Sequence, residues 1–159
     1  GQASCAKELI EDAGGLDYIV APVGGGGLLS GTALSAQYFS PNSIVIGAEP
    51  TGADDAFRSM QANNIIPSKN PKTIADGLLT SLGTLTFPII KKYVSKIMTV
   101  EDSVTTAAMK LVWQRMKIIV EPSAAVALAV IIDNGVAFRG KKVGVILSGG
   151  NVDFDKLPF

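Results

Sequence analysis

Residues 18–28 read YIVAPVGGGGL, an apolar run followed directly by four consecutive glycines. An apolar run that ends in glycines predicts a β-strand, here Tyr18–Val23. The apolar residues of Leu28–Phe39 predict a helix, which Pro41 ends. Glycine has no Cβ, and backbone N–H groups at a helix N-terminus attract anions, so this strand–loop–helix unit is typical of a phosphate-binding loop. The alternative is a flexible turn, although a turn does not need four glycines.

The alternation of strand and helix continues on both sides of this unit. Three further strands are predicted at Ser43–Ala48, Lys96–Val100 and Val143–Leu147. The other predicted helices are Gln2–Ala13, Gly52–Ala62, Thr73–Leu79, Phe87–Val94, Asp102–Met116 and a helix that begins at Pro122. Near-continuous apolar strands separated by helices imply an α/β fold with an open, mostly parallel sheet and helices on both faces. Ligands of such sheets bind at the carboxyl ends of the strands, which here follow Val23, Ala48 and Leu147.

Composition removes several classes of function. The formal net charge is zero, so no electrostatic argument favours nucleic acid or an anionic membrane as a partner. The most apolar run, Ala124–Ile132, has nine residues, whereas a membrane-spanning helix needs roughly 20. Histidine is absent, which removes Ser-His-Asp triads and histidine-ligated zinc. The single cysteine, Cys5, allows no intrachain disulfide, and a cytoplasmic location is expected.

The identity of the phosphate ligand is open on local grounds. No Gly-Lys-Ser/Thr follows the glycines, so the loop is not a P-loop. The dinucleotide pattern G-x-G-x-x-G fails narrowly, because Ser30 stands at its third glycine position. Glu49 lies near the place where such a domain carries its ribose-binding acid. A dinucleotide-binding module is therefore the first alternative, and a noncatalytic ligand-binding domain is the second.

An ordered set of motifs resembles the serine racemase and serine/threonine dehydratase family of fold-type II pyridoxal-phosphate enzymes. Pro22–Leu28 resembles the phosphate loop of that family, and Ser148-Gly149-Gly150-Asn151 resembles its pyridine-nitrogen loop. The match continues at Gly1-Gln2, Ala48-Glu49-Pro50, Ala53-Asp54-Asp55, Ile74-Ala75-Asp76-Gly77, Leu111-Val112-Trp113, Arg115-Met116-Lys117 and Glu121-Pro122. The resemblance implies that residues 1–159 are the C-terminal part of the large cofactor-binding domain.

The resemblance assigns cofactor contacts to particular residues. The cofactor phosphate would be held by Gly24, Gly25, Gly26, Gly27 and the amide of Leu28. The hydroxyl of Ser148 would meet the pyridine nitrogen, and Gly77 would approach the cofactor through its backbone. Glu121 would be either an acid near the cofactor or a charge favoured by the dipole of the helix that follows it.

The resemblance also implies a divalent cation and an effector. Glu49, Ala53 and Asp55 resemble a site for Mg²⁺, or for Ca²⁺ or Mn²⁺, in which two carboxylates and a backbone carbonyl supply hard oxygen ligands. The alternative is a pair of solvated acids near a helix start. Lys117 and Asn151 align with family positions that contact an activating nucleotide.

The resemblance leaves this chain without a catalytic residue of its own. The family lysine that forms the Schiff base belongs to an N-terminal half that this sequence does not contain. We therefore expect the chain to be a fragment that is inactive alone, with the N-terminal half as its partner and a homodimer as the assembly. The implied activity is racemisation of L-serine, or elimination of water from L-serine or L-threonine to give a 2-oxo acid and ammonia.

Overall fold

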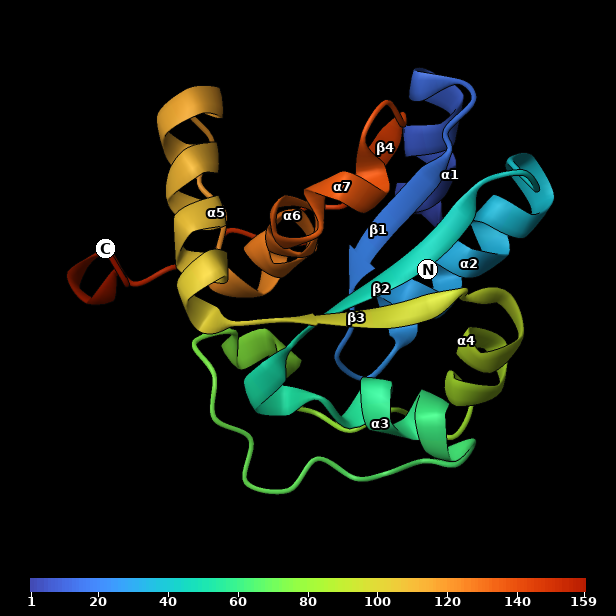
Figure 1. Ribbon diagram of the computed structural model, residues 1–159, viewed down its shortest axis with the longest axis horizontal. Coiled ribbons are helices and arrows are strands. Elements are labelled where there is room, and N and C mark those ends of the chain that lie inside the picture. The colour runs from blue at the N-terminus through green and yellow to red at the C-terminus, as the bar shows by residue number, and fades with distance from the viewer.

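The computed structural model describes all 159 residues and contains a single open sheet. Its four parallel strands are β1 (Tyr18–Pro22), β2 (Ile44–Pro50), β3 (Lys96–Val100) and β4 (Val143–Val145). The strand order is β3-β2-β1-β4, so the chain builds outward from β1 to β3 and then returns to place β4 on the other side of β1 (Figure 1). The predicted fold class is confirmed, and the sheet is parallel throughout.

Helices cover both faces of the sheet. The α-helices are α1 (Ala3–Ala13), α2 (Gly27–Phe39), α3 (Asp55–Ala62), α4 (Phe87–Tyr93), α5 (Asp102–Met116), α6 (Pro122–Asp133) and α7 (Gly135–Phe138). Three single 3₁₀ turns are η1 (Thr51–Ala53), η2 (Asp76–Leu78) and η3 (Phe154–Lys156). In Figure 1, α1, α2, α3 and α4 lie on one side of the sheet, and α5, α6 and α7 lie on the other.

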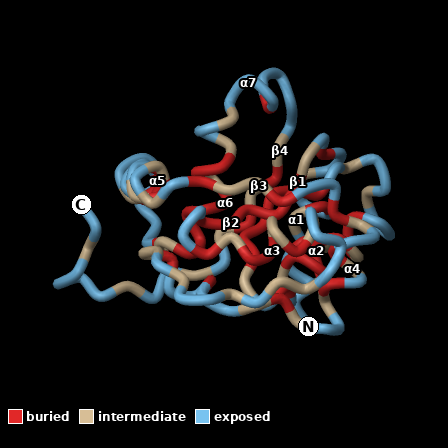
Figure 2. The backbone as a smooth tube through the Cα atoms, turned by 60° about the horizontal axis from the view of Figure 1, so that its bottom comes forward, coloured by how far each residue is buried: buried red, intermediate tan, exposed pale blue.

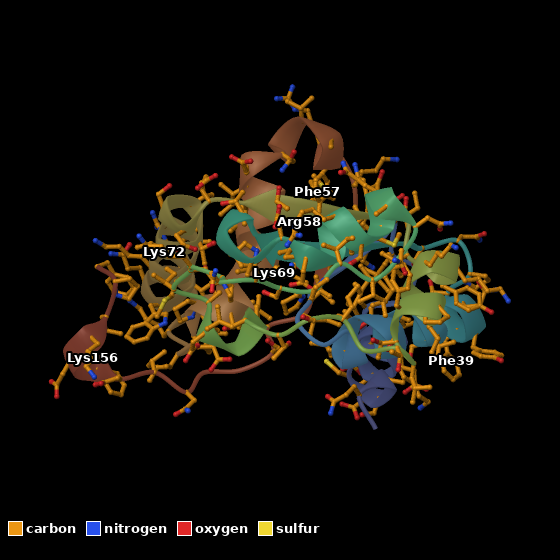
Figure 3. All side chains as sticks on the ribbon, turned by 90° about the horizontal axis from the view of Figure 1, so that it is seen from below. Phe39, Phe57, Arg58, Lys69, Lys72 and Lys156 are labelled. Carbon is orange, nitrogen blue, oxygen red and sulfur yellow. The ribbon has the colours of Figure 1, made fainter.

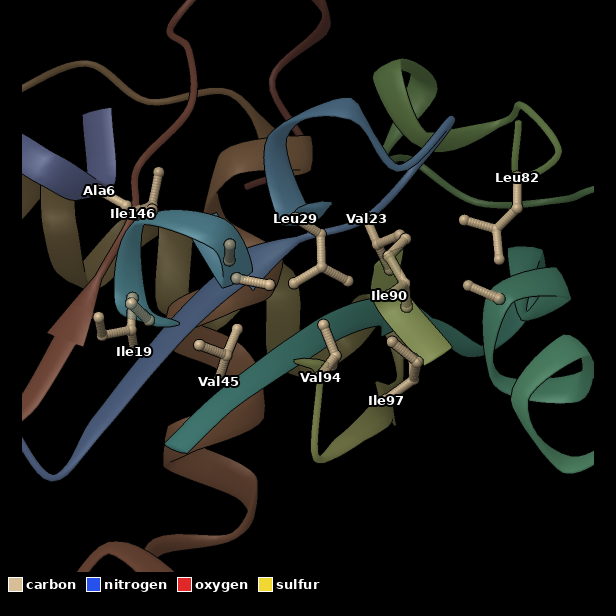
Figure 4. Close-up of a cluster of buried hydrophobic side chains, with 14 of the residues drawn as sticks. Ala6, Ile19, Val23, Leu29, Val45, Leu82, Ile90, Val94, Ile97 and Ile146 are labelled. Carbon is tan, nitrogen blue, oxygen red and sulfur yellow. The ribbon is translucent and has the colours of Figure 1, made fainter. Parts of the chain in front are cut away.

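Side chains that alternate along the strands belong to two separate hydrophobic cores, one on each face of the sheet. From β1, Ile19 and Ala21 join the core beneath α1, α2 and α4, while Val20 joins the core beneath α6. This alternation follows from the two-residue period of a strand, and both faces are apolar because both are covered. Figure 2 shows the buried segments gathered around the sheet, and Figure 4 shows the first core in detail. None of the helices combines the length and apolarity needed to cross a membrane.

Two predicted helices differ from the structure. The helix predicted over 52–62 is divided into the turn η1 and the helix α3, because the carboxylate of Glu49 accepts hydrogen bonds from the N-terminal amides of α3. The helix predicted over 73–79 is a single turn, η2. Asp102 holds the segment before that turn by accepting hydrogen bonds from the hydroxyl of Thr73 and the amide of Ile74.

Candidate functional site

A cavity of about 200 Å³ lies at the carboxyl ends of β1 and β4, where the strand order reverses direction. In open parallel sheets this switch point is the usual place for a ligand. The cavity is lined by Pro22, Gly24, Gly25, Gly26, Gly27, Leu28, Gly77, Leu78 and Ser148. The structure thus brings together every residue predicted to bind the cofactor except Glu121, although these residues come from three distant parts of the sequence.

The glycine loop offers unsatisfied backbone donors to this cavity. The amides of Gly24, Gly25 and Gly26 donate no hydrogen bond to any group of the protein. The loop leads directly into α2, whose 13 residues place the positive end of a helix dipole at the same point. Free N–H groups at a helix N-terminus form a site for an anion, and a phosphate monoester matches it in charge and in acceptor number.

Gly77 forms the wall of the cavity that faces the glycine loop. A Cβ at Gly24 would lie 3.2 Å from the carbonyl oxygen of Gly77, so the two backbones approach closely because glycine stands at 24. The amide of Gly77 donates to the hydroxyl of Ser123 at 3.0 Å, and Ser123 is buried at the start of α6. This hydrogen bond therefore ties Gly77, which forms the cavity wall, to α6.

The loop after β4 carries Ser148, whose exposed hydroxyl has no hydrogen-bond partner within the protein. Glu121 fastens this loop. Its Oε2 accepts from the amide of Asn151 at 3.0 Å, and its backbone N–H donates to the carbonyl of Gly149 at 3.1 Å. A Cβ at Gly149 would lie 2.8 Å from Oε1 of Glu121, so a larger residue there would have to displace this carboxylate.

Both interpretations of Glu121 stay predictions, since it stands at the N-cap of α6 and also lies near Gly77. The side chain makes no capping hydrogen bond to α6, and Glu121 is not among the residues that line the cavity. It lies beside the cavity wall, with Oε1 3.9 Å from the position of a Cβ on Gly77. Glu121 therefore holds the Ser148 loop and lies near the wall at Gly77.

The predicted cation ligands lie at the end of β2 and the start of α3. Both oxygens of Glu49 accept backbone hydrogen bonds at 2.9 Å, from the amides of Ala56 and Phe57. The side chain is buried, and this burial raises the pKa of the Glu49 carboxyl to about 8 against the opposing effect of the two amides. Ala53 is buried beside them.

Asp55 is the second carboxyl group of this set and is also buried. Its Oδ2 accepts from the amide of Leu82 at 3.2 Å, whereas its Oδ1 has no partner. Burial raises the pKa of Asp55 above its ordinary value. A buried oxygen without a donor beside a second buried carboxyl group suits an oxygen-preferring cation. No group of three or more His, Cys, Asp or Glu side chains is gathered here or elsewhere.

Lys117 and Asn151 are both exposed and make no hydrogen bond to each other. Lys117 ends α5 with a left-handed backbone, at φ 61°. Their assignment to a nucleotide effector stays a prediction. No lysine of the chain is buried or lines the cavity; Lys69 and Lys72, for example, are exposed on the long segment after α3 (Figure 3).

Three residues that shape the site were not singled out from the sequence. Thr86 donates to the carbonyl of Gly25, Ser123 accepts from Gly77, and Asp102 holds the segment before Gly77. Each acts on the backbone of a residue at least 28 positions away. A local pattern carries no signal for such contacts, because the partner is a main-chain group that every residue type possesses.

Relatives of this chain were found by sequence and by structure. Beta-hydroxyaspartate dehydratase of Paracoccus denitrificans is 54% identical over 159 residues, which is all of this chain and 50% of that protein. Serine racemase of Dictyostelium discoideum is 51% identical over 162 residues, and its crystal structure superposes with a TM-score of 0.91 over 97% of this chain and 50% of that one. The crystal structure of a threonine deaminase from T.th. superposes with a TM-score of 0.92 at 42% identity, over 97% of this chain and 58% of that one.

The chain spans about half the length of the curated relatives that it matches. The family described as pyridoxal-phosphate dependent enzyme matches residues 1–149, which include the glycine loop, the wall at Gly77 and Ser148. With that match and with relatives above 50% identity over almost all of its length, the chain belongs to the family of pyridoxal-phosphate dependent enzymes.

Proposed function

We propose that this chain binds the phosphate and the ring of pyridoxal phosphate in an enzyme that acts on a β-hydroxy amino acid. The reaction would be racemisation, or elimination of water to give a 2-oxo acid and ammonia. One observation carries the proposal: free backbone amides of the glycine loop and the free hydroxyl of Ser148 meet in one cavity at the switch point of the sheet.

Each part of the cavity would contribute separately. The amides of Gly24, Gly25 and Gly26 would bind the phosphate, together with those of Gly27 and Leu28 at the start of α2. Ser148 would accept or donate a hydrogen bond at the pyridine nitrogen without carrying a charge. The bound cofactor would supply an electron sink for the electron pair left when the α-proton departs.

The remaining chemistry would come from outside this chain. The cavity lining contains no lysine and no arginine, so it offers neither an amine for a Schiff base nor a cation for a substrate carboxylate. We propose that residues 1–159 work as the C-terminal part of the large domain of a longer protein, whose N-terminal half supplies both groups. By family resemblance, the assembly would be a cytoplasmic homodimer.

The substrate would be serine, threonine or 3-hydroxyaspartate. The first two follow from the serine racemase and threonine deaminase relatives, and the third follows from the hydroxyaspartate dehydratase at 54% identity. All three carry a hydroxyl on the β-carbon, which is the group that elimination of water requires. A second substrate carboxylate would need a cationic partner, and this cavity does not provide one.

The test is to express the full-length protein and record its visible absorption before and after borohydride. We then add L-serine, L-threonine and L-threo-3-hydroxyaspartate in separate assays and measure 2-oxo acid, ammonia and D-amino acid. A borohydride-sensitive band together with one of these products is expected. A colourless protein that added pyridoxal phosphate does not convert would overturn the proposal, and saturable binding of NAD(P) by that protein would favour the dinucleotide alternative.

We also propose a divalent cation, with Mg²⁺ as the first candidate, at Glu49, Asp55 and the carbonyl of Ala53. The unpartnered Oδ1 of Asp55 supports this, because a buried carboxylate oxygen without a donor is costly unless an ion meets it. In the full-length protein, Mg²⁺ should raise the midpoint of thermal unfolding, and Asp55→Asn should remove this response. Asp54→Asn is the matched control, since Asp54 pairs with Arg58 at the surface. An Mg²⁺ response that survives Asp55→Asn would contradict the assignment.

A further inference from the structure

A second segment of the chain holds the glycine loop without lining the cavity. Residues 82–86 form the second part of the connection from η2 to α4, and none of them lines the cavity. The hydroxyl of Thr86 donates to the carbonyl oxygen of Gly25 at 2.8 Å, and the carbonyl oxygen of Gly83 is a more distant second acceptor at 3.1 Å. The amide of Gly83 donates to the same oxygen at 3.1 Å. This carbonyl is therefore held by two donors from one segment.

Fixing the carbonyl of Gly25 also fixes the amide of Gly26, because the two groups belong to one peptide plane. The chain contains no cis peptide bond, and in a trans peptide the C=O and the N–H point in opposite directions. Since the carbonyl points to Thr86, the N–H of Gly26 points away from residues 82–86. Gly26 lines the cavity and its N–H has no partner within the protein, so we infer that this N–H is available to a ligand there.

The segment that carries Thr86 is itself anchored at two points. The amide of Leu82 donates to Oδ2 of Asp55, and the side chain of Leu82 belongs to the first core together with Ile90 of α4. Figure 4 shows Leu82, Ile90 and Val23 pointing into this common cluster. Thr86 is thus attached to the body of the domain, so its hydroxyl can hold the loop in one orientation.

We propose that Thr86 is a positioning residue for the cofactor phosphate: its hydroxyl orients the peptide between Gly25 and Gly26 so that the amide of Gly26 is presented to the anion. The inference rests on the proposed function, because it requires that the anion in the cavity is the phosphate of pyridoxal phosphate. It adds a residue that lines no part of the cavity.

The test compares pyridoxal phosphate with pyridoxal, which lacks the phosphate, in the full-length protein. Thr86→Val removes the hydroxyl at nearly constant volume, and Thr86→Ser restores it. Thr84→Val is the matched control, since Thr84 is exposed in the same segment and its side chain makes no hydrogen bond. The dissociation constants of both ligands are measured by absorbance titration, and the ³¹P resonance of the bound cofactor is recorded.

For Thr86→Val, we expect affinity for pyridoxal phosphate about fivefold weaker, as the loss of one hydrogen bond implies, with affinity for pyridoxal unchanged. The ³¹P resonance should shift toward that of the free cofactor. Thr86→Ser and Thr84→Val should resemble the wild type in both. Equal losses for both ligands, or no loss for either, would overturn the inference. A wild-type protein that does not bind pyridoxal phosphate would instead overturn the proposed function.

Discussion

Gly26 combines a left-handed backbone, at φ 87°, with a crowded position. A Cβ there would lie 2.7 Å from Oγ1 of Thr86 and 2.8 Å from Cδ1 of Ile90. We expect Gly26→Ala to lower the free energy of unfolding by more than the ~1–2 kcal/mol that a left-handed alanine costs, and to weaken cofactor binding. Urea unfolding and cofactor titration of the full-length protein measure both effects.

Gly140→Ala is the control for this prediction. Gly140 has a similar φ of 73°, but a Cβ there would have no neighbour within 4 Å. It should cost about 1–2 kcal/mol and leave cofactor binding unchanged. Equal destabilisation by the two substitutions would show that the crowding around Gly26 is relieved without cost.

At the level of single residues, the sequence predicts which glycines approach the cavity but not what holds them. Four consecutive glycines are visible as a motif, and the resemblance adds Gly77 and Ser148. Glu121 is predicted to lie beside the cofactor or at the helix dipole, and neither prediction specifies that its carboxylate accepts a hydrogen bond from the amide of Asn151. A carboxylate can accept from any backbone amide within reach, so its partner is decided by how the loops meet in space.

Among the elements, the segment before η2 depends on one side chain of α5. Asp102 accepts from the hydroxyl of Thr73 at 2.5 Å and from the amide of Ile74 at 3.0 Å. Asp102→Ala should lower the free energy of unfolding by about 1–3 kcal/mol, because it leaves partly buried donors without an acceptor. It should also weaken cofactor binding, since this segment leads to Gly77.

Hydrogen exchange checks this prediction at the right place. Amides of residues 74–78 should exchange faster in Asp102→Ala than in the wild type, while those of β1 should not change. Glu101→Ala is the control, because the exposed side chain of Glu101 makes no hydrogen bond. Unchanged exchange over 74–78 would show that the segment is held by other contacts.

The strands and most helices could be predicted because apolar residues recur along them with the period of the element. All four strands were predicted, and the bounds of α5 were predicted to the residue. The two departures, at 52–62 and 73–79, have one cause. Glu49 and Asp102 accept hydrogen bonds from backbone amides of these segments, and acceptors that lie outside a segment leave no trace in its periodicity. The helix α7 was missed because four residues carry too little periodicity.

For the molecule as a whole, residues 82–86 join the acidic pair to the glycine loop. Leu82 donates to Asp55 at one end of the segment, and Thr86 donates to Gly25 at the other. If Mg²⁺ binds at Asp55, it should raise the affinity for pyridoxal phosphate, and the cofactor should raise the affinity for Mg²⁺ by the same factor. Calorimetric titration of the full-length protein in both orders measures the two factors. Independent binding of the two ligands would show that the segment does not couple the sites.

The isolated chain provides a further test of the proposal that the N-terminal half supplies the Schiff-base lysine. Because its cavity contains no lysine, residues 1–159 expressed alone should show no dehydratase or racemase activity with any of the three substrates. Production of 2-oxo acid and ammonia, followed in the presence of added pyridoxal phosphate, is the measurement. The full-length protein is the positive control, and turnover by the isolated chain would contradict the proposal.

The cavity draws on residues 24–28, 77–78 and 148, so it spans most of the chain. Ser148 follows β4, which pairs with β1 but is the last of the four strands to be synthesised. On the ribosome, the glycine loop proposed to bind the phosphate is therefore made long before Ser148, which is proposed to meet the ring. Full cofactor loading must wait until β4 has left the exit tunnel and closed against β1. Cofactor capture would thus follow the pairing of β4 with β1.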